Sequence, residues 1–585
     1  MTESYIQKRK KPFWVLTAGE VSLLLLVIMV SSLKYEVSDD FFMEMVLSGV
    51  YTGKPDPHIM FSNVLWGMFL LPFYKISSIV SWYFVFQILI CLLSYIALVY
   101  VVTDQMQSWI ACAALAVFTL FTAMDLYILP QFTKTAMAAV VSGSIVFYYS
   151  LCRKKSLWVT LAGFILIIFG LLIRLSVVYI AAPFIVIYVF GHILVLDKNV
   201  NYRYKIAIVL CSLVLFWLII NGSMFLDRHA YTEPAYAYFK QYSSVRSKII
   251  DYPKPPKSYM ESELVKLGFT SNDYSMILNW CFADQKVFSL EKMKALLEVI
   301  SDYRSVNNIS IRSILGTIKN RKMLVYPGTL CCVTLGLISI INNSKRIWFL
   351  FLDAAIVVGF CCLFPALGRN VYRVEFCCFY GAAAIILCSQ NTSDYKPAKV
   401  LAVCLLSFFT LVYQLRLYLP DNTFPGLDTQ EYRDYIDNTL FYSGTYDSEK
   451  YKIRIIPYGI HTSFINTVKE HPENLYILDF FTTIQTLYYD IPPYISAASA
   501  FPKNALYLSG VTVNHPGVDE YIHSLGYRDP LAALLEKNVY LVDNGTQDLI
   551  VTFFREHGHP NAELIENAGL SGYNIWTISD SKNES

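Results

Sequence analysis

Long apolar runs alternate with short polar segments through the first 420 residues of the chain. A helix needs about 20 apolar residues to cross a bilayer, and most of these runs approach that length. The pattern predicts a mainly α-helical, polytopic membrane protein with about eleven transmembrane helices. The expected spans are 13–33, 79–102, 109–122, 136–151, 157–173, 177–196, 206–225, 323–341, 347–363, 374–389 and 400–417.

Basic residues between the runs predict the orientation, because Lys and Arg concentrate in cytoplasmic loops. With the N-terminus in the cytoplasm, the clusters at 153–155, 198–205 and 345–346 all fall on the inner face. This requires that the run 60–74 does not cross. It has only 15 residues and contains Pro72, so we expect it at the outer interface. The first run lacks a small-residue cleavage site and is predicted to be an uncleaved anchor.

Two outer segments, 34–78 and 226–322, interrupt the predicted membrane domain 1–420. Apolar residues recur at three-to-four spacing after Ser289, which predicts an amphipathic helix there. From residue 421 the pattern changes to short apolar strands, NLYILDF, ALYLSG and NVYLVDN, separated by helical stretches. Residues 421–585 are therefore predicted to form an extracytoplasmic α/β domain with a largely parallel sheet. Residues 562–579 read as a terminal hairpin.

Composition agrees with a membrane protein, since 55% of the residues are hydrophobic and only 16% are charged, against roughly 25% charged in soluble domains. Twelve of the 13 cysteines lie in or beside apolar runs, and Cys281 is the exception. None has metal-ligand spacing. The net charge of +2 comes without a basic stripe, so we expect no nucleic-acid partner.

An acidic pair, Asp39 and Asp40, follows the first predicted span. Two carboxylates at a bilayer exit are poorly explained by packing, because a buried carboxylate is costly. A positioned carboxylate can instead act as the general base toward an acceptor hydroxyl. The alternative is an ordinary solvated loop.

Several polar residues that could bind a substrate are predicted on the same outer face. They are His58, Lys134, Arg174, Arg369, Tyr372 and Arg373. Arginine suits bidentate contact with phosphate. Each residue also has a structural alternative: arginines anchor helix ends at headgroups, lysine snorkels, and a histidine between prolines forms a turn. Nucleotide-binding and common hydrolase motifs are lacking from the sequence.

Five segments together resemble one family. They are SDDF at 38–41, PDPHIMFSNVLWGMFLLPFYK at 55–75, DLYILPQFTK at 125–134, LLIRLSVVYIAAP at 171–183 and GRNVYR at 368–373. Their layout over residues 1–420 resembles the GT-C superfamily of polytopic membrane glycosyltransferases, which includes protein O-mannosyltransferases and aminoarabinose transferases. The resemblance implies transfer of a sugar from a polyprenyl-phosphate donor to a cell-surface glycan or lipid acceptor at the outer face of a bacterial plasma membrane.

The resemblance also implies roles for individual residues. The family's carboxylate after the first span corresponds to Asp39 or Asp40, and the choice between them stays open. Asp39 is the candidate base, with Asp40 orienting it or binding a divalent cation such as Mg or Mn. Arg174, Arg369 and Arg373 are candidates for the lipid phosphate. The alternatives are a polysaccharide polymerase, a lipid or glycan flippase, and a non-catalytic scaffold.

Overall fold

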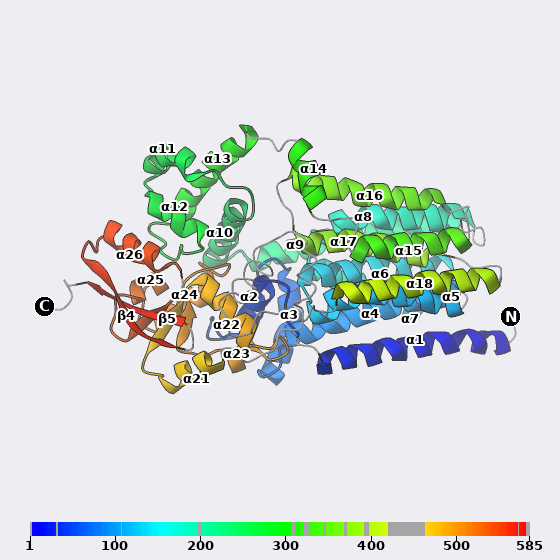
Figure 1. Cartoon of the computed structure of the whole chain (residues 1–585), viewed down its shortest axis with the longest axis horizontal. Helices are drawn as coiled ribbons and strands as arrows, with labels where there is room; N and C mark the ends of the chain where they lie inside the picture. Colours follow the sequence, from blue (N-terminus) through cyan, green and yellow to red (C-terminus); the bar gives the residue numbers. More distant parts are fainter. Residues whose placement is uncertain are drawn as a thin grey trace.

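The computed structural model describes residues 3–30, 33–106, 108–196, 201–306, 311–320, 327–342, 347–367, 371–390, 397–418, 462–543, 545–570 and 573–580. It has two parts along its long axis, a bundle of long helices and a second body of shorter helices and a sheet (Figure 1). The bundle consists of α1 (Glu3–Val30), α4 (Trp82–Gln105), α5 (Ser108–Ala123), η1 (Met124–Ile128), α6 (Phe132–Cys152), α7 (Leu157–Ile173), α8 (Val177–Val186), η2 (Ile187–Leu196), α9 (Tyr202–Ala230), α15 (Pro327–Asn342), α16 (Ile347–Ala366), α17 (Tyr372–Cys388) and α18 (Pro397–Tyr418).

The described residues include six helices that are long and apolar enough to cross a membrane. They are Pro12–Met29, Trp82–Gln105, Trp109–Ile128, Phe132–Cys152, Tyr202–Ala230 and Trp348–Ala366. Five further apolar helices have only 10 to 17 residues. The predicted mainly helical, multi-pass character is therefore confirmed, whereas the count of about eleven spans is not.

α6 lies at the centre of the bundle, with 94% of its most apolar window buried, against 11% for α1 and α9. Two glycines explain how closely α6 approaches α7. A Cβ atom on Gly143 would lie 2.7 Å from the Gly163 carbonyl oxygen, and one on Gly163 would lie 2.8 Å from the Gly143 carbonyl oxygen. Small residues at facing positions are the usual way for membrane helices to pack this tightly.

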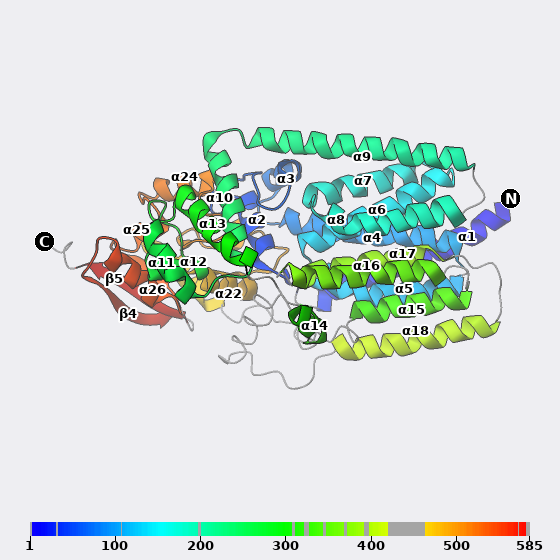
Figure 2. The same ribbon diagram turned by 90° about the horizontal axis from the view of Figure 1, so that it is seen from above.

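α3 (Val64–Ile76) corresponds to the run predicted to stay at the interface. It has 13 residues, too few for the roughly 20 that a span needs, and it lies across the end of the bundle, where Figure 2 shows it end-on. The side chain of Asn63 caps α3 by accepting from Leu65 N at 3.0 Å and also donates to Ser223 O of α9 at 3.1 Å. Asp227 of α9 accepts from Val64 N at 2.9 Å.

The C-terminal region contains a five-stranded sheet of order β2-β1-β3-β5-β4. Its strands are β1 (Leu475–Leu478), β2 (Ala505–Tyr507), β3 (Val539–Val542), β4 (Ala562–Leu570) and β5 (Tyr573–Asp580), and its helices are α21 (Thr462–Glu470), α22 (Phe480–Asp490), α23 (Ala497–Ala500), α24 (Pro516–Ser524), α25 (Pro530–Ala533) and α26 (Gln547–Glu556). β1 pairs in parallel with β2 and β3, and β5 pairs antiparallel with β3 and β4. The predicted strands and terminal hairpin are confirmed, but the sheet is mixed rather than largely parallel.

Between α9 and α15 lies a segment that contains α10 (Pro234–Ile250), α11 (Lys257–Leu267), α12 (Ser271–Leu278), α13 (Leu290–Val306) and α14 (Ile311–Asn320). Its helices α10 and α12 pack against the C-terminal region, whereas its last helix, α14, packs against α16 of the bundle (Figure 1). α13 is the helix predicted after Ser289, and its residues Met293, Leu296 and Ile300 are buried as their spacing indicated.

α2 (Ser38–Ser48) joins the bundle to the second body. Its Phe42 ring stacks on Phe480 of α22 with ring centroids 5.8 Å apart. Its Glu44 carboxylate accepts from Ala497 N at 3.0 Å and from the Tyr74 hydroxyl at 3.2 Å. These contacts place α2 between the end of the bundle and the C-terminal region.

Candidate active site

Asp39 and Asp40 lie in the first turn of α2. Consecutive residues of an α-helix are rotated by about 100° around its axis, so the two carboxylates point in different directions. Acidic side chains at this end of a helix are favoured by its dipole. The acidic pair of the sequence is therefore two separate sites in the fold.

Asp40 points into the protein and is fully buried. Its Oδ1 accepts three hydrogen bonds, from the Tyr83 hydroxyl at 3.0 Å, Gln87 Nε2 at 3.1 Å and Phe132 N at 3.1 Å. Burial raises the pKa of Asp40 to about 7, although these hydrogen bonds lower it. Asp40 thus ties α2 to α4 and to the beginning of α6, a position suited to orienting its neighbour.

Asp39 points the other way, and its side chain is 22% exposed. Burial raises the pKa of Asp39, while the positive charges of Arg373, Arg174 and Arg246 lower it and Asp251 raises it further. Arg373 Nη2 lies 3.8 Å from Asp39 Oδ2. We call these five residues the Asp39 cluster. A carboxylate whose pKa is raised above its ordinary value is better suited to general-base catalysis.

The three arginines of the Asp39 cluster come from three helices that are far apart in the sequence. Arg174 is the C-cap residue of α7, and its guanidinium lies 4.7 Å from the centroid of the Phe132 ring. Arg373 lies in the first turn of α17, and Arg246 lies on α10. Arg369 lies outside the described residues. The structure thus brings Arg174 and Arg373 of the predicted phosphate site to Asp39 and adds Arg246.

Lys134 and Tyr372 belong to a buried charged group beside this site. Lys134 Nζ lies 2.5 Å from Glu36 Oε2 and 2.8 Å from Asp125 Oδ1, and it donates to Leu129 O at 3.1 Å. The Tyr372 hydroxyl lies 3.0 Å from both carboxylate oxygens of Asp125. Asp125 is carried by η1, a π-helical turn. The ammonium group of Lys134 is therefore already bound by groups of the protein itself.

His58 contacts a different part of the molecule. Its Nδ1 lies 2.7 Å from Asp56 Oδ1 and its Nε2 lies 3.2 Å from Ala230 O. The ring stacks on Tyr236, whose hydroxyl donates to Asp56 Oδ2 at 2.5 Å. Both ring nitrogens therefore face acceptors, and His58 links the segment 34–78 to the connection between α9 and α10.

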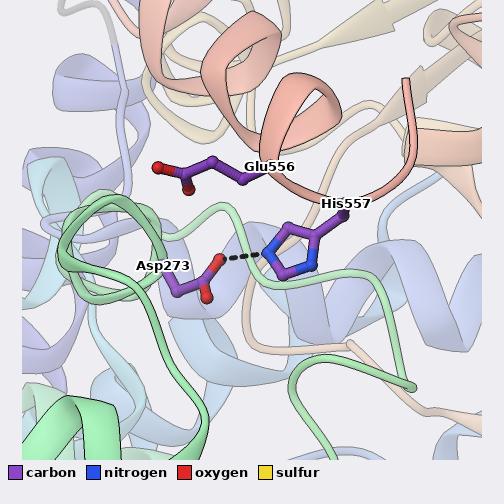
Figure 3. A group of neighbouring side chains, drawn as sticks. All are labelled: Asp273, Glu556 and His557. Carbon is purple, nitrogen blue, oxygen red and sulfur yellow. Dashed lines mark hydrogen bonds and ion pairs between the residues drawn. The ribbon is translucent and has the colours of Figure 1, made fainter. Parts of the chain in front are cut away.

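One group of three described residues, Asp273, Glu556 and His557, has ligand atoms close enough for a metal ion, all within 4.8 Å of one another. Figure 3 shows Asp273 pointing at His557 across the contact between α12 and α26. Asp273 Oδ1 lies 2.8 Å from His557 Nε2, and Glu556 Oε2 accepts from Thr270 Oγ1 at 2.7 Å. Hydrogen bonds between the two elements account for this group. Asp40 is not part of it, so a divalent cation at Asp40 stays a prediction.

Arg246 and Glu36 were not among the binding residues predicted from sequence. A signal for Arg246 existed: it follows Phe239 and Tyr242 and precedes Ile249 on α10, all at helical spacing, and all four are buried. An arginine on the apolar face of an amphipathic helix indicates a buried polar contact. Glu36 had no such signal, because its partner Lys134 is remote in the chain.

Comparisons with protein-family models, with curated proteins and with solved structures find no match to this chain.

Proposed function

We propose that this chain is a membrane glycosyltransferase of the GT-C type, transferring a sugar from a polyprenyl-phosphate donor to a cell-surface glycan or lipid acceptor. The observation that carries the proposal is the Asp39 cluster, in which a carboxylate with a raised pKa lies among three arginines at the end of a helical bundle. Glycosyl transfer from a lipid phosphate needs both: a base for the acceptor and cations for the phosphate.

In the proposed reaction, Asp39 accepts the proton of the acceptor hydroxyl as its oxygen bonds to the anomeric carbon of the sugar. The bond between that carbon and the phosphate oxygen breaks, and its electron pair leaves with the polyprenyl phosphate. Arg373 and Arg174 stabilise the negative charge that develops on this leaving group. Asp40 holds α2 in place through its three hydrogen bonds, and Asp39 returns its proton to solvent.

The hydrocarbon tail of the donor has a candidate binding groove within the bundle. α15, α16 and α17 line a cavity of about 460 Å³ whose surface is mostly apolar and includes the buried acid Asp353. Thr329 and Ile340, which lie 11 residues apart on α15, both line it, so it follows that helix for roughly 16 Å. A long cavity open between helices suits a polyprenyl chain that enters from the bilayer.

We further propose eleven spans in a bacterial plasma membrane, with the N-terminus cytoplasmic and the C-terminal domain extracytoplasmic. α6 begins at Phe132, whose N–H bonds Asp40, and ends at Cys152, beside the basic residues 153–155. Its 21 residues span about 31 Å, close to the thickness of the bilayer core. The positive-inside rule then puts residues 153–155 in the cytoplasm and the Asp39 cluster outside.

Cysteines introduced at Lys257 and Lys537, both exposed in the second body, are expected to react with a membrane-impermeant thiol reagent in intact cells. A cysteine at the exposed Lys154, at the opposite end of the bundle, is expected to react only after permeabilisation. The measurement is labelling above the background of the native cysteines. Labelling of residue 154 in intact cells would reverse the proposed orientation.

The proposed reaction is tested by incubating the purified full chain with a polyprenyl-phosphate-linked sugar and candidate acceptors. We expect free polyprenyl phosphate to appear in step with glycosylated acceptor. A flippase would move the intact lipid across a vesicle membrane without breaking the sugar–phosphate bond. A polymerase would require a diphosphate-linked repeat unit and would release a diphosphate. Either of those outcomes would contradict the proposal.

A further inference from the structure

Arg246 is a buried cation that lacks a contacting carboxylate among the described residues. Its side chain is 2% exposed, and its one hydrogen bond to a described residue runs from Nη2 to Ser243 Oγ at 3.4 Å. Its Nε is buried without a hydrogen-bond partner among those residues. Asp39 and Asp251 act on it through their charge. A buried charge without a paired partner is costly, which indicates that the guanidinium is held ready for an anion.

Trp280 holds the guanidinium from one side. The guanidinium carbon lies 5.1 Å from the centroid of the Trp280 ring, within the range of a cation–π interaction. The Trp280 ring stacks on Phe480 with centroids 4.4 Å apart and planes 10° apart. Phe480 in turn stacks on Phe42 of α2. A column of rings therefore connects Arg246 to the helix that carries Asp39.

The backbone of Trp280 is held in an unusual conformation by the C-terminal domain. Its φ is +62°, uncommon for a residue with a bulky side chain. Ser509, just after β2, donates from Oγ to Trp280 O and accepts from Phe282 N at 3.2 Å. A strained backbone persists only where its surroundings hold it, and such strain concentrates at functional sites.

The segment around Trp280 occupies the edge of the sheet where α/β domains usually bind ligands. The chain runs from β1 to β2 on one side and then to β3 on the other, so the strand order reverses between β1 and β3. Phe480 follows β1 and Thr546 follows β3. Trp280 stacks on Phe480, and Cys281 Sγ lies 3.9 Å from Thr546 Oγ1. This edge thus binds a segment of the chain's own outer loop.

We propose that Arg246 is a third anion-binding arginine for the phosphate of the donor, and that the C-terminal domain sets its position through Trp280. This inference rests on the proposed function for the identity of the ligand. The three arginines and two carboxylates of the Asp39 cluster leave a net charge of +1 before a phosphate binds. The C-terminal domain is then a positioning element for the membrane site.

Binding of farnesyl monophosphate and of inorganic phosphate to the purified full chain tests the role of Arg246 without requiring turnover. Arg246→Ala is expected to raise the Kd for farnesyl monophosphate about 10-fold or more, because it removes charge-assisted hydrogen bonds. Lys248→Ala is the matched control, since Lys248 is an exposed cation on the same helix. The Kd of this variant for farnesyl monophosphate is expected to stay within about twofold of that of the unaltered chain. An unchanged Kd in Arg246→Ala would overturn the inference. Measuring the Kd for inorganic phosphate tests whether the phosphate group alone is enough for Arg246→Ala to weaken binding and Lys248→Ala to leave it unchanged.

The positioning role of Trp280 is tested by a double-mutant cycle on the same binding measurement. Trp280→Ala is expected to weaken binding nearly as much as Arg246→Ala, and the double variant is expected to bind no more weakly than Arg246→Ala alone. Trp280→Phe, which keeps a ring, is expected to recover most of the affinity. Additive losses in the double variant would overturn positioning through Trp280. If the variants bind phosphate as expected but the purified chain transfers no sugar, the proposed function is refuted and the phosphate-binding site is still supported.

Discussion

Replacing Asp39 with Asn is expected to lower the rate of sugar transfer by about 10²–10⁴-fold, the usual cost of losing a positioned general base. The amide keeps the size of the side chain but cannot accept the acceptor's proton. The rate of the unaltered chain is expected to rise with pH through the pKa of Asp39, because only the deprotonated carboxylate is a base and burial raises that pKa. The measurement is initial transfer rate against pH with purified protein.

Asp40→Asn is the matched control for this experiment. An amide oxygen can accept the same hydrogen bonds from Tyr83, Gln87 and Phe132 that Asp40 Oδ1 accepts. The pKa of Asp40 is raised to about 7 in the fold, so the folded state holds more protons than the unfolded state between the two pKa values. Its carboxyl therefore makes the protein less stable as the pH rises through that window, and the amide removes this cost. We expect a folded protein whose transfer rate falls far less than that of Asp39→Asn, and an equal fall would instead support the predicted divalent cation at Asp40. A rate of sugar transfer by Asp39→Asn equal to that of the unaltered chain would refute Asp39 as the base.

Replacing Lys134 with Met is expected to destabilise the protein by about 3–5 kcal/mol, because it removes one partner of a buried ion pair. The variant leaves two buried carboxylates, Glu36 and Asp125, without the cation that now lies within 2.8 Å of both. The measurement is the free energy of unfolding in detergent, with thermal inactivation as a second readout.

The control for Lys134→Met is Lys75→Met, a change of the same kind at an exposed lysine, expected to alter stability by less than about 0.5 kcal/mol. Adding Asp125→Asn to Lys134→Met is expected to restore part of the lost stability, since it removes one of the two uncompensated charges. Equal unfolding free energies for Lys134→Met and the unaltered chain would show that the buried group does not hold the fold together.

The helices and strands followed from local patterns in the sequence. Apolar runs such as 79–102 predicted α4, and the three-to-four spacing after Ser289 predicted α13. The strands ending at Leu478, Tyr507 and Val542 were predicted from short apolar runs bounded by Asp or Gly. These elements can be predicted because burying one face of a helix or strand requires apolar residues to recur with the period of that element. The mixed sheet was not predicted, since pairing direction depends on strands distant in the chain.

The sequence by itself determined which segments are apolar and where the acidic pair falls, and it predicted which cations lie near that pair. Only the tertiary structure separated Asp39 from Asp40, because their environments come from α4, α6, α10 and α17 rather than from their neighbours in the chain. It likewise bound Lys134 to Glu36 and Asp125 and brought Arg246 to the site. The role of a charged side chain depends on burial and on partners within a few ångströms, and folding alone brings those partners together.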